Sequence, residues 1–181
     1  MKKTNLNEYL QMELPNDKEQ LTADVVVSLE HAGYEIVEVN TEKPWGSYVR
    51  IRNDQADDFV YEFFPGLSPE EARLGMDDAE LSPKILIVSP GQRLSWQYHH
   101  RRAERWRFLT KGGYNKSLDD EPGDVVVAEA GDVVQFEKSE RHRLNGAEDG
   151  YVVVAEIWQH VDPVAPSNED DIVRLYDDYS R

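Results

Sequence analysis

The sequence predicts an all-β protein, built as a sandwich, jelly roll or barrel and preceded by a helical segment. From Lys84 onward, short stretches rich in β-branched and aromatic residues follow one another at nearly regular spacing. Turn residues separate these stretches, for example Pro90-Gly91, Gly112-Gly113 and Gly131-Asp132. The most extended helical periodicity lies before Gly33, so the helical part precedes the strands.

The helical segment is predicted over residues 1–33. Asn16, with Glu19 three positions later, forms a capping box, and Gly33 is a helix stop. Between these signals, apolar residues recur at helical spacing: Leu21, Val25, Leu29 and Ala32. Such a stripe is typical of a helix that packs on the main body rather than one that binds a partner.

After Gly33 the apolar period changes to that of strands, expected at 34–39 and 47–51 with a turn at Lys43-Pro44-Trp45-Gly46 between them. Residues 53–82 are polar and acidic and are predicted to form an insertion with one short helix, 68–74. The remaining strands are predicted at 84–89, 93–100, 104–110, 124–129, 132–137, 142–145 and 151–159. Residues 172–176 form a last strand or a docked turn. The single domain thus divides into an extension with the first strand, 1–42, and the barrel, 43–181.

Composition excludes several classes of protein. The 181 residues carry a net charge of −16, which disfavours nucleic-acid binding because phosphate backbones require basic surface. An anionic substrate therefore needs a local cluster of Arg or Lys. The absence of Cys excludes disulfides, thiolate metal sites and thiol nucleophiles. We see no apolar core of an export signal after Met1 and no membrane span, so we expect a cytoplasmic protein with no membrane partner.

Residues 90–106 carry the candidate chemistry. Strand alternation places Gln97 and His99 on one face, about 7 Å apart. A turn through 101–103 returns Glu104 on the neighbouring strand, and a later strand reaches His142. The four O and N donors suit one divalent ion, with Zn²⁺ first and Mn, Fe, Co or Ni as alternatives. The competing interpretation is a set of polar residues satisfied inside a barrel.

The spacing of these residues resembles the cupin superfamily. Gly91-x5-Gln97-x-His99-x4-Glu104 matches its first metal motif, with Gln97 where many members have His. Gly131-x10-His142 matches the second motif, although Glu137 and Ser139 replace Pro and Gly. Longer blocks resemble the C-terminal domain of type II mannose-6-phosphate isomerases: 43–48, 94–100, 102–106, 142–144, 169–174 and 178–179. The resemblance covers residues 43–52 and 84–181.

This resemblance implies a cupin jelly-roll barrel and a homodimer. It also implies a metal-dependent aldose–ketose isomerase of a phosphosugar, with mannose-6-phosphate converted to fructose-6-phosphate in sugar-nucleotide or polysaccharide precursor metabolism. Two departures from the family pattern are Arg101 and Arg105, which replace histidines. The chain has no Gly-rich nucleotide-binding start, so we expect a cupin without guanylyltransferase activity.

Four further residues are candidates for binding or catalysis. Arg93 is predicted on the strand face of Gln97, where its planar guanidinium could clamp a phosphate. Arg102 is the next candidate and is predicted in the turn before Glu104. The family resemblance adds Arg174 in the tail. An isomerase also needs a general base, for which Glu156 on the last long strand is the candidate. Many of the neighbouring arginines could instead form salt bridges with the surplus carboxylates.

Two other functions remain open at this stage. One is a non-catalytic, metal-containing cupin that binds a sugar or regulates carbohydrate metabolism. The other is an oxygenase that uses the same four ligands with Fe²⁺. The blocks at 43–46 and 169–174 favour the isomerase over the oxygenase, because the general cupin motif requires neither. They do not separate an isomerase from a binding protein.

Overall fold

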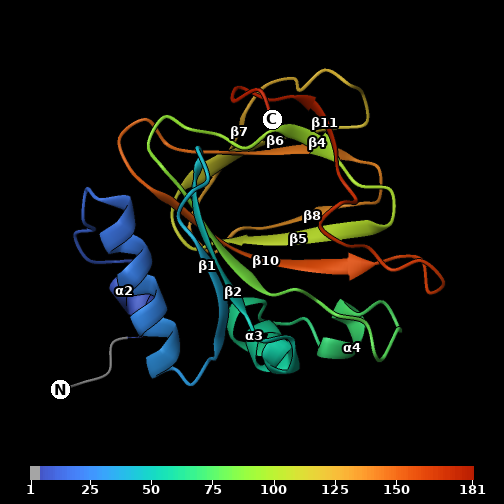
Figure 1. Cartoon of the computed structure of the whole chain (residues 1–181), viewed down its shortest axis with the longest axis horizontal. Helices are drawn as coiled ribbons and strands as arrows, with labels where there is room; N and C mark the ends of the chain where they lie inside the picture. Colours follow the sequence, from blue (N-terminus) through green and yellow to red (C-terminus); the bar gives the residue numbers. More distant parts are fainter. Residues whose placement is uncertain (1–4) are drawn as a thin grey trace.

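The computed structural model describes residues 5–181 and confirms the all-β jelly roll with N-terminal helices (Figure 1). The helices are α1 (Leu6–Tyr9), α2 (Lys18–His31), η1 (Asn53–Gln55, a 3₁₀ helix), α3 (Ala56–Phe63) and α4 (Pro69–Ala72). The first strands are β1 (Ile36–Asn40), β2 (Gly46–Ile51), β3 (Lys84–Val88), β4 (Trp96–Tyr98), β5 (Arg102–Phe108) and β6 (Gly112–Ser117). The later strands are β7 (Val126–Ala128), β8 (Val133–Phe136), β9 (Arg141–Asn145), β10 (Val152–His160) and β11 (Val173–Tyr176).

The strands form two facing antiparallel sheets. Sheet A has six strands in the order β1-β2-β3-β10-β5-β8, and sheet B has five in the order β11-β4-β9-β6-β7. Figure 1 shows β4, β6, β7 and β11 of sheet B lying opposite β5, β8 and β10 of sheet A. The barrel interior is the space between the two sheets.

Helices cover the outer face of sheet A. Leu21 and Leu29 of α2 and Phe59 of α3 are buried in one cluster with Ile85 and Ile87 of β3. In Figure 1, α2 lies beside β1 and β2, while α3 and α4 lie on the side of sheet A away from sheet B. Because both faces of sheet A are covered, every residue of β3 and β10 is buried, which explains their nearly continuous apolar sequences.

The barrel interior changes from apolar to polar along its strands. β10 and β5 pair in a register that places Val154 opposite Phe108 and, farther along, Trp158 opposite Glu104. Val154 and Phe108 belong to the apolar cluster between the sheets. Since side chains on one face repeat every second residue, Glu156 and Trp158 continue the interior face of β10 beyond that cluster. The polar end of the barrel is therefore where a site can form.

Strand β6 was not predicted, because Gly112-Gly113 indicated a turn. The structure places both glycines inside the strand, at positions where there is no room for a side chain. A Cβ on Gly112 would lie 2.5 Å from a methyl group of Val152, and one on Gly113 would lie 2.8 Å from Val125. Gly112 therefore permits close packing inside the barrel, and Gly113 permits it on the opposite face of β6, which a local turn pattern does not distinguish.

The acidic segment 53–82 is part of the core rather than a polar excursion. Its helix α3, which was not predicted, buries Phe59 and Phe63 completely, with ring centroids 4.6 Å apart. The predicted short helix is present as α4 with a Ser68 capping box. At the N-terminus, Asp17 rather than Asn16 caps α2. Within residues 5–181, no helix is long and apolar enough to cross a bilayer.

Candidate metal centre

Three strands of two sheets bring the predicted ligands together. Glu104 lies on β5 of sheet A, while His142 lies on β9 of sheet B and His99 directly follows β4. Gln97 on β4 pairs in register with His142. All four side chains are buried at the polar end of the barrel interior, so the structure brings the four predicted ligands together.

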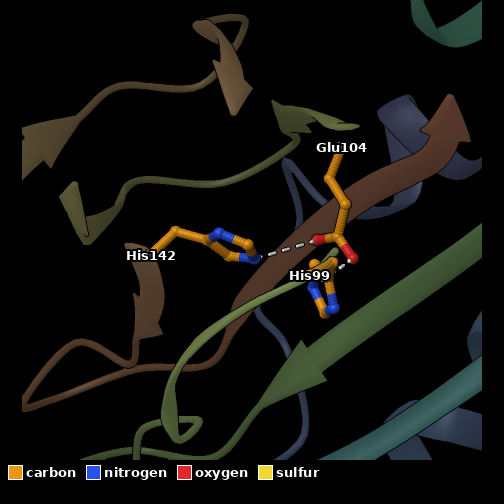
Figure 2. A group of neighbouring side chains, drawn as sticks. All are labelled: His99, Glu104 and His142. Atoms are coloured by element: carbon orange, nitrogen blue, oxygen red, sulfur yellow. Dashed lines mark ion pairs between the residues drawn. The ribbon is translucent and has the colours of Figure 1, made fainter. Parts of the chain in front are cut away.

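Glu104 lies between the two imidazoles (Figure 2). Its Oε1 is 2.9 Å from Nε2 of His99, and its Oε2 is 3.3 Å from Nε2 of His142. One donor atom from each of the three residues lies within 4.8 Å of the others. The described residues therefore include a compact N, O, N set that could hold a metal ion.

Backbone carbonyls fix the orientation of both imidazoles. Nδ1 of His99 donates to the carbonyl oxygen of Asp171 at 2.6 Å, and Nδ1 of His142 donates to that of Glu140 at 3.0 Å. Nδ1 of each ring thus carries a proton, and Nε2 of each ring lies on the side of Glu104. Hydrogen bonding of the second ring nitrogen is the usual support of histidine metal ligands.

The electrostatics of the centre fit a bound cation. Nε2 of His142 is buried and has no hydrogen-bond partner within residues 5–181, which is costly unless another group satisfies it. Burial lowers the pKa of His99 more than Glu104 raises it, which keeps the ring neutral. Burial raises the pKa of Glu104, but its interaction with His99 and the charge of Arg102 outweigh this effect and hold the pKa well below its usual range. The neutral imidazole of His99, the imidazole of His142 and the Glu104 carboxylate thus converge on one point, as metal ligands do.

Gln97 supplies the fourth predicted donor. Its Oε1 accepts a hydrogen bond from the Ser95 hydroxyl at 2.6 Å, and its side chain lines the same cavity as Glu104. An amide oxygen has two lone pairs, so one remains for a further contact. The structure thus leaves Gln97 compatible with the role of a fourth ligand.

Arg102 supports Glu104 from the same face of β5. Its Nε donates to Oε1 of Glu104 at 2.9 Å, and its guanidinium stacks 3.8 Å from the ring centroid of Trp158. Nη1 donates to the Ser167 hydroxyl at 2.9 Å and to the Asn168 carbonyl at 3.0 Å. With these contacts made and its side chain buried, Arg102 orients the carboxylate and has little capacity left to clamp a phosphate.

Glu156 lines the same cavity as Glu104 and is almost fully buried. Burial, and then the charge of Glu104, raises the pKa of Glu156 to about 7, against the opposite effect of Lys84. Its Oε2 accepts a hydrogen bond from Nε1 of Trp106 at 3.0 Å. A carboxyl with this pKa can accept and release a proton near neutral pH, as a general base must.

The cavity is more cationic than the protein as a whole. Among the described residues, its lining includes five cations, Lys43, Lys84, Arg102, Arg174 and Arg181. It includes three carboxylates, Glu104, Glu156 and Glu169. A net positive lining in a chain of charge −16 matches the local cationic cluster that an anionic substrate requires.

Two of these cations have no ion pair within residues 5–181. Lys84 pairs with Glu169 at 2.8 Å, whereas Lys43 and Arg174 have no carboxylate within 4.0 Å among the described residues. Arg174 is on β11, directly opposite Gln97 in register. The tail residue chosen from the sequence therefore lies beside the predicted ligand Gln97 and has no ion pair among the described residues.

Arg93 does not reach this cavity. Its Nε pairs with Oδ2 of Asp178 at 2.7 Å, and its side chain is 46% exposed. Strand β4 begins only at Trp96, whereas Arg93 lies in an isolated bridge with Asn145. The regular alternation assumed from residue 93 onward therefore ends before Arg93, and the structure does not bring it together with the other candidates.

Sequence reasoning missed two cavity cations. Lys84 was assigned only to a strand. A lysine at the start of the apolar run Ile-Leu-Ile-Val was the available signal, because a strand of this kind is usually buried and a buried lysine is rare. Lys43 was assigned to a turn motif. Both line the cavity, and Lys84 lies directly opposite Glu156 in the β3–β10 register.

Comparisons with known proteins add a family. The sequence pattern described as "Mannose-6-phosphate isomerase C-terminal" matches residues 75–177. Protein SchB of Streptomyces halstedii is 30% identical over 82 residues, which are 45% of this chain and 54% of SchB. The chain thus spans about half the length of this curated relative.

Solved structures show similarity at low identity. The capsular polysaccharide assembling protein CapF from Staphylococcus aureus gives a TM-score of 0.51 at 15% identity, over 87% of this chain and 41% of CapF. A Cupin 2 conserved barrel domain protein from Salinispora arenicola gives a TM-score of 0.46 at 17% identity, over 70% of this chain and 83% of that one. The similarity to CapF concerns the fold alone.

Proposed function

The chain belongs to the mannose-6-phosphate isomerase C-terminal family, and on this premise we propose that it is a metal-dependent aldose–ketose isomerase of a phosphosugar. We assign mannose-6-phosphate and fructose-6-phosphate as the substrate pair, in the supply of sugar-nucleotide or polysaccharide precursors. The observation that carries the proposal is that one cavity is lined by Glu104, by Glu156 and by two cations that have no ion pair within residues 5–181.

The ligands we assign are His99, Glu104 and His142, with Gln97 as the fourth. Their N and O donors favour Zn²⁺, with Mn, Fe, Co or Ni as alternatives. A divalent ion held there supplies positive charge that polarises neighbouring substrate oxygens. Arg102 holds Glu104 in place through the 2.9 Å ion pair between them.

Glu156 is the proton-transfer group in this proposal. Aldose–ketose isomerisation moves a proton from C2 to C1. The Glu156 carboxylate accepts the C2 proton, and the electron pair of the broken C–H bond forms the C1=C2 bond of a cis-enediol. The same carboxyl then returns the proton to C1. Lys84, opposite Glu156, exchanges the protons that the C1 oxygen gains and the C2 oxygen loses.

Arg174 and Lys43 hold the phosphate in this proposal. Both line the cavity without an ion pair within the described part of the chain, and a guanidinium binds phosphate through two parallel hydrogen bonds. At long range the net charge of −16 repels a dianion, so binding relies on these short-range contacts.

The proposal is tested by incubating metal-free protein with mannose-6-phosphate and each divalent ion in turn. We expect fructose-6-phosphate to form with Zn²⁺ or one of its alternatives and to be absent after chelation. Metal-loaded protein that binds the sugar phosphate but forms no product would favour the sugar-binding cupin instead.

We further propose that the protein works in the cytoplasm as a homodimer, as the family resemblance implies. Light scattering combined with size-exclusion chromatography measures the oligomeric state directly. A mass equal to the 20.9 kDa of one chain would overturn the dimer.

A further inference from the structure

One residue of the C-terminal segment, Asp171, holds the turn that carries a metal ligand. Its carboxylate is nearly fully buried and accepts backbone hydrogen bonds from His100 at 2.9 Å and Arg101 at 3.0 Å. It also accepts a hydrogen bond from the Ser167 hydroxyl at 2.6 Å. These contacts join the segment between β10 and β11 to the turn between β4 and β5.

The backbone carbonyl of Asp171 acts on the centre itself. It accepts the 2.6 Å hydrogen bond from Nδ1 of His99, and a longer one, 3.4 Å, from Nη1 of Arg102. The same residue therefore orients the imidazole ligand and contacts the guanidinium that pairs with Glu104. Asp171 lies outside the strands, between β10 and β11, and is 72 positions from His99 along the chain.

We propose that Asp171 is the positioning residue of the metal centre and that its docking couples divalent-ion binding to ordering of residues 167–171. The proposal rests on the metal centre of the proposed function. With the turn held by the carboxylate, the carbonyl of Asp171 holds the proton on Nδ1 of His99, so that Nε2 faces Glu104 with its lone pair. A displaced Asp171 would leave that imidazole free to rotate away.

The hydrogen bonds of the Asp171 carboxylate indicate which substitution should disturb the metal centre. Three donors, two backbone N–H groups and one hydroxyl, converge on the two carboxylate oxygens of Asp171. An amide has one acceptor oxygen and an NH₂ group. In Asp171→Asn, the NH₂ group would therefore take the place of one carboxylate oxygen and face a hydrogen-bond donor. Asp170→Asn is a matched control, because it makes the same change of charge one position earlier at an exposed side chain.

The experiment measures the affinity of metal-free protein for Zn²⁺ by competition with a chromophoric chelator. Asp171→Asn should weaken Zn²⁺ binding by about 10–100-fold, the range for groups that orient metal ligands, and Asp170→Asn by less than about threefold. A purely structural role would lower the melting temperature of the metal-free variant but leave the affinity of the folded fraction unchanged. Asp171→Asn that binds Zn²⁺ as the wild type does overturns the proposal.

The coupling has its own readout in hydrogen exchange. Because linkage is reciprocal, Zn²⁺ should slow amide exchange of residues 99–101 and 167–171 in the wild type and much less in Asp171→Asn. If Asp171→Asn fails to fold, Ser167→Ala decides, since it removes one of the three donors and should weaken Zn²⁺ binding measurably. An unchanged affinity in Ser167→Ala would then overturn the proposal.

The outcomes also separate this inference from the proposed function. Wild-type protein with no affinity for divalent ions would overturn both the metal centre and the role of Asp171. Wild-type protein that binds Zn²⁺ without isomerising any phosphosugar would overturn only the proposed activity, because the comparison of affinities still tests Asp171.

Discussion

Substitution of Arg174 by Gln removes the cavity cation that is best placed to bind a phosphate. Arg174 lies opposite Gln97 in register and forms no ion pair within residues 5–181. A hydrogen bond to a charged group contributes about 1.5–3 kcal/mol, and the exposure of Arg174 argues for the lower end. About 1.5 kcal/mol corresponds to a roughly tenfold rise in KM. We expect kcat to change little, because the phosphate is remote from C1 and C2 and contributes equally to ground-state and transition-state binding.

The assay is the steady-state rate of fructose-6-phosphate formation over a range of mannose-6-phosphate concentrations. Arg93→Gln is the matched control, since it makes the same substitution on a guanidinium that pairs with Asp178 outside the cavity. Its KM should stay within about twofold of wild type, because exposed ion pairs contribute little. An unchanged KM in Arg174→Gln, or an equal rise in both variants, would refute the assignment of the phosphate site.

Three further substitutions test other parts of the account. His142→Ala should lose most of the bound metal, because Nε2 of His142 has no other partner within residues 5–181; elemental analysis that still finds one ion per chain contradicts this. Glu156→Gln should lower kcat by about 10²–10⁴-fold. In the wild type, kcat/KM should rise as pH increases through about 7, where Glu156 loses its proton, and a pH profile lacking that limb argues against the base. Phe59→Ala should destabilise the fold by about 3–5 kcal/mol in urea unfolding, and a loss below about 1 kcal/mol would mean that α3 is peripheral.

The strands and the grouping of the candidate ligands could be predicted because strand alternation and motif spacing are local signals. Period-two patterning placed Gln97 on the same face as His99 and carried Glu104 back on the next strand. The spacing from Gly131 to His142, which resembles the second cupin motif, added the fourth residue. These inferences required the direction of side chains along a strand and the spacing of the motif, and both are local signals.

The features that escaped prediction depend on contacts between distant segments. Gly112 reads locally as a turn, but Val152 occupies the space that a side chain there would need. Asp171 reaches the turn after β4 only because the tail folds back across the barrel mouth. Arg93 was assigned to the cavity because the strand was assumed to be regular, whereas its pairing with Asp178 depends on the same tail. Local patterns do not report such packing.

The central claim is that this metal-dependent cupin transfers a proton between C2 and C1 of a phosphosugar. Proton NMR of mannose-6-phosphate in D₂O with the Zn²⁺-loaded protein tests it directly. We predict that fructose-6-phosphate appears and that deuterium enters at the carbon that receives the proton, since the carboxyl of Glu156 can exchange with solvent. A spectrum in which mannose-6-phosphate stays unchanged and unlabelled, with each divalent ion that the protein is shown to bind, would contradict the claim.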